Sequence, residues 1–379
     1  MIYLDNAATT FPKPSKVLDA VDNCQRNYAV NVGRGSYPLA NYATKIVDET
    51  RALLAAMVNA TSPNQVVFTA SATIAANEVI MGLHWDAFKT VYVSPFEHNA
   101  IARPLNRMCA LKGIEMKILP FNAKTQQLDL EETDRMFAID SPDYVFMNHI
   151  SNVTGLILPI DIVSQKAKQY GACVVVDAAQ SLGIADINIQ KTQIDYLIFA
   201  GHKNLYASWG IGGFISNNDI LVPTLSGGTG ADSLNLIMSD KTPVGFEPGS
   251  PNIIAIASLN ASIKWLNSIG IGTIADKKRK LMDRLMDGMR DTNITLYLPA
   301  DSKAHTSVLS FNIEGYTASE IGTVLGEDYD IAVRTGFHCA PFVHRLLNTE
   351  KNMGTVRISI GFFNSEEDID AVTKAIAEL

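Results

Sequence analysis

Short apolar runs alternate with amphipathic segments between about residues 45 and 255, and this alternation constrains the fold more than any other feature of the chain. The runs have strand length, and the segments between them carry apolar residues at helical spacing. Such alternation is typical of an α/β protein, in which a mostly parallel sheet is covered by helices. The predicted strands are QVVFT (65–69), TVYVSP (90–95), MKILPF (116–121), YVFMNHI (144–150), CVVVDA (173–178), YLIFAG (196–201) and GGFIS (212–216).

The pattern changes after the Gly/Pro-rich stretch FEPGSPN (246–252), which precedes a long helical segment. The remainder has strand-like pieces (HTSVLSFNI, IAVRTG, TVRISIGF) and a helical tail, which indicates a smaller α+β domain. A chain of 379 residues also exceeds the size at which one core keeps growing. We expect an N-terminal segment (1–15) that packs with the small domain, a large domain (16–257) and a small C-terminal domain (258–379).

The composition excludes several classes of partner. The net charge is -8 and no dense Lys/Arg cluster occurs, so nucleic acid is not expected as a partner. The N-terminus MIYLDNAATT lacks a basic region followed by an apolar stretch, and no segment approaches eighteen apolar residues. We therefore expect a cytoplasmic protein without a membrane partner.

Four cysteines lie far apart, with no C-x-x-C pair, which favours free thiols in a reducing compartment. Cys24, Cys109 and Cys173 fall in apolar patterns and are interpreted as core residues. Cys339, in VRTGFHCAPF, lies instead among loop-like, polar neighbours. A zinc site on this loop is not predicted, because a second cluster of ligands is missing.

Polar residues end several of the apolar runs, and in open α/β sheets ligands collect at the carboxyl ends of the strands. Asp177 ends one run, and Lys203 follows another in AGHK. A lysine and a carboxylate in one crevice suit pyridoxal phosphate, with the lysine forming a Schiff base and the carboxylate pairing with the ring nitrogen. The alternatives are a helix N-cap for Asp177 and a solvated charge for Lys203.

Two further segments suit the same cofactor. FTASATIAAN (68–77) passes from a strand into a predicted helix, whose free backbone N–H groups can hold a phosphate, and Thr73 can add a hydroxyl. VSPFEHNA (93–100) ends a strand with His98, which suits ring stacking, proton transfer or a purely structural hydrogen bond. The glycines of WGIGG (209–213) do not fit a dinucleotide-binding motif.

Together these residues resemble the class V aminotransferase family of fold-type I pyridoxal phosphate enzymes, and within it the group of cysteine desulfurases and selenocysteine lyases. The resemblance covers essentially the whole chain. The motifs that carry it, in order, are YLDNAATT (3–10), NVGRGSY (31–37), HISNVTG (149–155), VDAAQS (176–181), AGHK (200–203), PGSPN (248–252) and RTGFHCAP (334–341).

The resemblance implies roles for individual residues. For the cofactor, Lys203 binds it covalently, Asp177 pairs with its ring nitrogen, Gln180 contacts its ring hydroxyl and His98 stacks on the ring, while its phosphate is held by Thr73, Ala72, His202 and Ser250 of a partner subunit. For the substrate, the carboxylate is held by Asn152 and Arg357, the entrance is lined by Arg334, and the nucleophile is Cys339. The role of Ser250 from a partner subunit implies a homodimer. The resemblance implies no metal ion.

The chain departs from the family pattern at two places. Ala200 stands before G-H-K where a hydroxyl residue is usual, and Ala72-Thr73 stands where paired threonines are usual. We therefore expect phosphate binding to be weaker or rearranged. HCAPFVH also replaces the residues that usually follow the cysteine in the family, which leaves partner choice and substrate preference open.

The implied reaction converts L-cysteine to L-alanine and leaves a persulfide on Cys339 for a protein sulfur acceptor, as in iron–sulfur cluster assembly. Because the thiolate is the nucleophile, we expect Arg334 and His338 to favour it. Three alternatives stay open: a selenocysteine lyase, which needs no attacking thiol; a transaminase, which releases a keto acid; and a non-catalytic scaffold.

Overall fold

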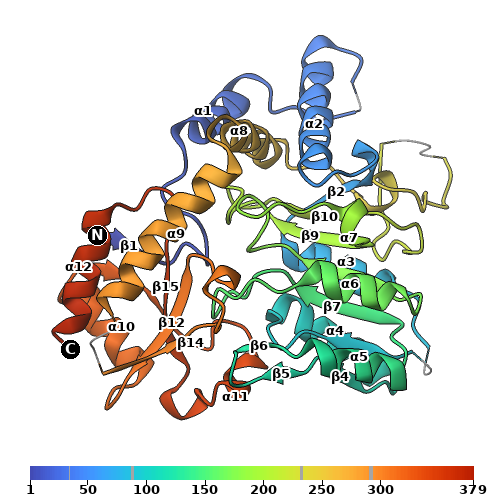
Figure 1. Cartoon of the computed structure of the whole chain (residues 1–379). Coiled ribbons are helices and arrows are strands. Elements are labelled where there is room, and N and C mark those ends of the chain that lie inside the picture. Colours follow the sequence, from blue (N-terminus) through green and yellow to red (C-terminus); the bar gives the residue numbers. More distant parts are fainter. Residues whose placement is uncertain (34, 87–88, 231–233, 290–292) are drawn as a thin grey trace.

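A seven-stranded sheet forms the centre of the larger part of the molecule in the computed structural model, which describes residues 1–33, 35–86, 89–230, 234–289 and 293–379 (Figure 1). Six of its strands are parallel, and β10 runs antiparallel to both its neighbours. The strand order is β2 (Val66–Thr69), β10 (Gly212–Ser216), β9 (Tyr196–Ala200), β8 (Cys173–Asp177), β7 (Tyr144–Asn148), β3 (Val91–Val93) and β4 (Met116–Ile118).

Both faces of this sheet are buried, as a parallel sheet requires. Alternate residues of one strand enter different cores: Val145 and Met147 join one cluster, Tyr144 and Phe146 the other. Figure 1 shows α5 and α6 on one face and α3 and α4 on the other. The helices of this part are α1 (Ser15–Asn27), α2 (Pro38–Met57), α3 (Ala72–Gly82), α4 (Asn99–Lys112), α5 (Leu130–Ile139), α6 (Ile160–Lys168), α7 (Ile189–Thr192) and α8 (Ile253–Ile269).

A smaller antiparallel sheet lies beside the large one, with its own apolar core. Its strand order is β11 (Ile294–Tyr297), β12 (Val308–Ile313), β15 (Thr355–Ser359) and β14 (Arg334–Gly336). The helices that follow α8 are α9 (Ile271–Gly288), α10 (Ala318–Glu327), α11 (Val343–Leu346) and α12 (Glu366–Ala377).

The N-terminal segment packs on the side of the molecule that holds the small sheet. Strand β1 (Ile2–Tyr3) pairs in parallel with β13 (Ile331–Ala332), and Leu4 belongs to the small core. Both chain ends consequently lie at this side in Figure 1.

The division into domains stays a prediction. The apolar side chains of α8 and Ile274 of α9 belong to a core of the large sheet, whereas Leu281 of α9 belongs to the small core. We propose that the change between the two domains falls inside α9, later than residue 257.

All seven predicted strands are confirmed, each within a few residues of its expected bounds. The segment IAVRTG, expected as one strand, is divided at Val333 into β13 and β14, which pair in different sheets. Four strands were not predicted: β1, β5 (Phe121–Asn122), β6 (Gln127–Leu128) and β11. Arg34 of the motif NVGRGSY lies outside the described residues. Within the described ranges, every helix is too short or too polar to cross a bilayer.

Candidate active site

The carboxyl ends of β7, β8 and β9 meet at one edge of the large sheet and form a small cavity. Asn148 lies opposite Asp177 across β7 and β8, and Lys203 follows three residues after β9 ends. The cavity is lined by His98, Asn148, Ile150, Asn152, Asp177, Ala179, Gln180 and Lys203. The structure therefore brings together five of the residues that the sequence singled out: His98, Asn152, Asp177, Gln180 and Lys203.

Asp177 and Lys203 form the charged centre of this cavity. Asp177 is buried, and its Oδ1 accepts a hydrogen bond from the Ala179 amide at 2.8 Å. Burial raises the pKa of Asp177, and the charge of Lys203 opposes that shift. Burial likewise lowers the pKa of Lys203, and Asp177 opposes the shift. Each group thus favours the charged form of the other. The alternative role of Asp177 as a helix N-cap is wrong, because only a turn follows β8.

His98 is both a structural residue and a cavity residue. Its Nδ1 accepts a hydrogen bond from the Ala100 amide at 3.0 Å and so caps helix α4. Burial, followed by the charge of Lys203, lowers the pKa of His98 to about 3. The imidazole is therefore neutral near pH 7, and because Nδ1 accepts a hydrogen bond, its proton resides on Nε2.

The expected phosphate residues lie at the start of helix α3. Ala72 and Thr73 are its first two residues, and Ser71 caps the helix by accepting from the Ile74 amide at 3.3 Å. A Cβ on Gly212 would come within 2.6 Å of the Ala72 amide nitrogen, so only glycine permits this approach of β10 to the helix. The result is an exposed helix N-terminus whose dipole suits an anion.

His202 is held by two residues that the sequence did not indicate. Its ring stacks on Trp209, with centroids 4.1 Å apart, and Lys13 Nζ donates to its carbonyl oxygen at 2.7 Å. Burial lowers the pKa of His202 to about 3, and its Nδ1 is buried without a hydrogen-bond partner among the described residues. A buried polar atom in this state favours a ligand at the ring.

Ser250 does not join the other predicted residues in the cavity. It is exposed, and together with Ile74 and Gly210 it lines a different cavity of about 340 Å³. Its role across a subunit boundary stays a prediction.

Two arginines face one another on neighbouring strands of the small sheet. Arg334 of β14 lies opposite Arg357 of β15. Arg357 is fully buried; it donates to the Asn152 carbonyl at 2.9 Å and forms an ion pair with Asp5 at 2.5 Å. Its Nε has no partner within the described part of the chain. Burial lowers the pKa of Arg357, and Arg334 contributes to the shift. The unpartnered Nε of Arg357, with Arg334 beside it, suits an incoming carboxylate.

Cys339 lies on the loop after β14, which is fixed at two carbonyl groups. Asn152 Nδ2 donates to the His338 carbonyl at 2.8 Å, and the Asn99 amide donates to the Cys339 carbonyl at 2.7 Å. The thiol is partly exposed, and Arg334 Nη2 lies 3.6 Å from its Sγ. Arg334 therefore places a positive charge beside the sulfur, as the sequence predicted.

The prediction that His338 favours the thiolate of Cys339 is wrong. Its ring is buried and its Nε2 bonds Thr355 Oγ1 at 2.8 Å rather than the thiol. Burial holds the pKa of His338 well below its usual range, so the ring carries no charge that could stabilise a thiolate.

A family model for class V aminotransferases matches residues 2–372. The chain belongs to the class V aminotransferase family. It is 34% identical to a probable cysteine desulfurase of Pyrococcus abyssi, over 100% of this chain and 94% of that protein. The apo structure of a cysteine desulfurase from Thermococcus onnurineus NA1 superposes with a TM-score of 0.91 at 31% identity, covering 100% and 94% of the two chains. The cysteine desulfurase CsdA of Escherichia coli gives 0.87 at 27% identity, covering 99% and 94%.

Enzymes of the class V aminotransferase family use pyridoxal 5'-phosphate, and the residues of the cavity fit this group. Lys203 and Asp177 supply an amine and a carboxylate. Outside the residues that line this cavity, the unpartnered Nδ1 of His202 and the backbone amides at the start of α3 are polar groups that suit a phosphate. Ala72 and Ala200 offer no side-chain hydroxyl to a phosphate, and the expected weaker or rearranged phosphate binding stays a prediction.

Asp5, Lys13 and Trp209 are the main residues of this region that the sequence did not reveal. Asp5 and Lys13 belong to the N-terminal segment, whose path across the molecule has no local signal. Their only cue is their place in or next to the motif YLDNAATT.

The neutral state of His98 predicts how stability depends on pH. An unfolded histidine has a pKa near 6.5, so the unfolded state binds more protons than the folded state below that value, and stability falls as the pH falls. Replacing His98 by Asn keeps a capping oxygen but removes this proton. We expect the slope of the unfolding free energy against pH, measured by urea unfolding between about pH 6 and 4.5, to decrease by up to about 1.4 kcal/mol per unit.

Arg107→Gln, on the same helix, is the control, because it removes no group that titrates in this range. A slope that is the same in His98→Asn as in the wild type would show that His98 protonates in the folded protein.

Proposed function

We propose that this protein is a pyridoxal phosphate-dependent cysteine desulfurase, which converts L-cysteine to L-alanine and leaves the sulfur as a persulfide on Cys339. The observation that carries the proposal is the position of the Cys339 thiol beside Arg334, close enough to Lys203 and Arg357 to influence the pKa of each. The names of the similar proteins support the same reaction.

Lys203 and Asp177 would hold the cofactor, Asp177 at the ring nitrogen. When bound, pyridoxal phosphate supplies an electron sink for charge that develops at the substrate Cα. As a buried carboxylate, Asp177 would keep the ring nitrogen of the cofactor protonated. Lys203 has a lowered pKa, which suits an amine that takes and returns the Cα proton.

Arg357 would orient the substrate by its carboxylate. The guanidinium is fixed by Asp5 and by the Asn152 carbonyl, and its Nε remains to donate. Because its partners hold it in one position, little side-chain entropy is lost when a carboxylate binds.

Cys339 would receive the sulfur. Its thiolate attacks the substrate sulfur, an S–S bond forms, and the C–S bond breaks with its electron pair remaining on Cβ. A proton completes alanine, and the neutral His98 with its proton on Nε2 is a donor available in the cavity. Arg334 Nη2 lies 3.6 Å from this sulfur and would place a positive charge beside it during the attack.

The alternatives differ in their products. A selenocysteine lyase acts without an attacking thiol, a transaminase leaves the amine form of the cofactor and a keto acid, and a scaffold stays colourless with added cofactor. The names of the similar proteins do not favour these alternatives.

Removing the thiol tests the assignment of Cys339. In Cys339→Ala, we expect alanine release from L-cysteine to fall by about 10³-fold or more, the scale for losing a nucleophile, while release from L-selenocysteine persists. Alanine assays and a mass measurement of the sulfur added to the protein check this. Cys24→Ala, a buried thiol of α1, is the control. Undiminished turnover of L-cysteine in Cys339→Ala would contradict the role.

Replacing the guanidinium of Arg357 by an amine tests whether this residue binds the substrate carboxylate. Arg357→Lys keeps the charge that pairs with Asp5 but loses the planar donors, so we expect KM for L-cysteine to rise about tenfold or more with a smaller change in kcat. Steady-state kinetics measure the two constants. The control is Arg26→Lys, which alters an exposed pair with Asp22. An unchanged KM would remove Arg357 from substrate binding.

We further propose a homodimer. Apolar side chains are exposed along the segment that precedes Ser250, including Leu225, Leu234, Leu236 and Ile237, and such exposure favours a protein interface. We expect sedimentation equilibrium of the cofactor-loaded protein to give twice the chain mass. A monomer that retains activity would contradict this proposal and the expected role of Ser250.

A further inference from the structure

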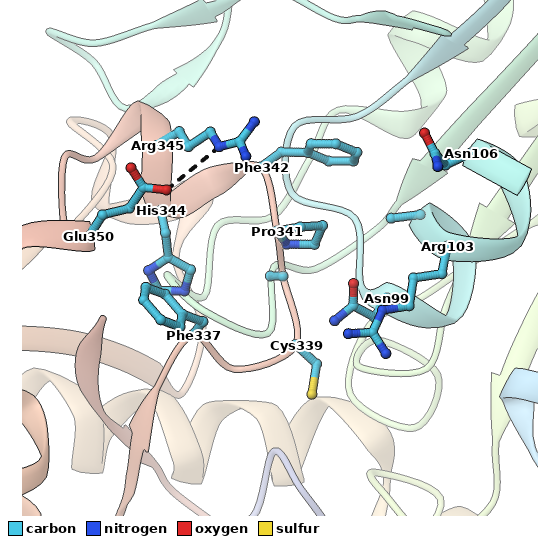
Figure 2. A pocket seen from close by; sticks show the side chains of 12 residues that line it. Asn99, Arg103, Asn106, Phe337, Cys339, Pro341, Phe342, His344, Arg345 and Glu350 are labelled. Atoms are coloured by element: carbon cyan, nitrogen blue, oxygen red, sulfur yellow. Dashed lines mark ion pairs between the residues drawn. The ribbon is translucent and has the colours of Figure 1, made fainter. Parts of the chain in front are cut away.

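A second cavity of about 490 Å³ lies on the side of Cys339 that faces helices α4 and α11 (Figure 2). Residues Asn99, Ala102, Arg103 and Asn106 of α4 line it at intervals of three, one and three, which places them on one face of the helix. The opposite side is the segment from Phe337 to Arg345. This volume is in the range of sites for small molecules.

Through the hydrogen bond that Asn152 of the inner cavity donates to the His338 carbonyl, Cys339 is tied to that cavity. It lines the outer cavity, whereas Lys203 and Asp177 line only the inner cavity. A sulfur atom carried on Cys339 therefore lies at the edge of a hollow of small-molecule size.

The outer cavity carries an unneutralised positive charge. Arg345 forms an ion pair with Glu350 at 3.6 Å, so these two charges offset each other. Arg103 is exposed, and no acidic side chain of the described residues lies within ion-pair distance of it. Figure 2 shows its guanidinium beside Asn99, at the Cys339 end of the cavity. Arg103 also contributes to the lowered pKa of His98, in agreement with this position.

A buried, unpartnered ring nitrogen completes the set of polar groups. His344 lines the cavity and is 2% exposed; its Nδ1 bonds Thr349 Oγ1 at 2.7 Å, and its Nε2 has no partner among the described residues. The two amides Asn99 and Asn106 add donors and acceptors. Arg103, His344 and the amides are the groups expected around a small polar ligand rather than an apolar one.

We propose that the outer cavity binds a low-molecular-mass thiol bearing a carboxylate, which accepts the sulfur from Cys339, with Arg103 as the residue that selects the anion. The proposal rests on the proposed desulfurase function and deepens it by naming the class of acceptor.

The transfer balances without any oxidant. The thiolate of the acceptor attacks the outer sulfur of the persulfide on Cys339, a new S–S bond forms, and the bond between that sulfur and Sγ breaks. Its electron pair remains on Sγ as the Cys339 thiolate, which Arg334 stabilises. The acceptor leaves as a persulfide, and the enzyme returns to the state that attacks the next substrate.

The test uses cofactor-loaded enzyme that has been charged with L-cysteine and freed of excess substrate. Loss of the persulfide is then timed with three acceptors of similar size: 3-mercaptopropionate, 2-mercaptoethanol and cysteamine. In Arg103→Gln we expect the ratio of the rate constants for the anionic and the neutral thiol to fall about tenfold, as for loss of a charge-assisted hydrogen bond. The same ratio in the wild type should fall in about 1 M salt, because screening weakens exposed charges.

Arg107→Gln is the matched control, since Arg107 is an exposed arginine of the same helix that does not line the cavity. Arg103→Lys should recover part of the anion preference. An anion-to-neutral ratio in Arg103→Gln equal to that of the wild type would overturn the proposal, as would an equal fall in Arg107→Gln. Absence of alanine and persulfide after charging the wild type would instead overturn the desulfurase function itself.

Discussion

The attraction between the charges of Asp177 and Lys203 is the interaction on which the site depends. A carboxylate and an amine in one small cavity each cost free energy to bury, and each offsets the cost of the other. Parallel strands make this arrangement possible, because β8 and β9 end at the same edge of the sheet and deliver both groups there. The two histidines whose pKa Lys203 helps to lower are both neutral near pH 7. His98 lines the cavity and accepts a hydrogen bond from backbone, and His202, which precedes Lys203, keeps an unpartnered Nδ1.

The sequence predicts the large sheet well because its signals are local. Apolar runs such as CVVVD specify a strand, and the polar residue that ends the run, Asp177, is placed by the strand itself. The same reasoning finds His98 and Thr73, which follow or begin regular elements. The specific roles come from resemblance, because spacing alone leaves a capping or a solvated role open.

Contacts between distant segments are what sequence reasoning misses. Asp5 meets Arg357 and Trp209 stacks on His202, and no periodicity indicates either contact. Sequence adjacency also misleads: His338 precedes Cys339 directly, yet its side chain turns inward to Thr355, while Arg334, five residues away, lies beside the sulfur. The left-handed backbone at His338 (φ 47°) and Cys339 (φ 57°) is the physical reason, since it separates the directions of the two side chains.

The loop that carries Cys339 is attached to both sheets. The loop begins at β14 of the small sheet. Its carbonyl groups at His338 and Cys339 accept hydrogen bonds from Asn152 and from the first amide of α4, which both belong to the part of the molecule around the large sheet. The position of the thiol therefore depends on both sheets, since the loop is attached to each of them. A small rotation of one sheet relative to the other would tilt the Cys339 loop. The relative orientation of the two sheets therefore sets the direction in which the sulfur points.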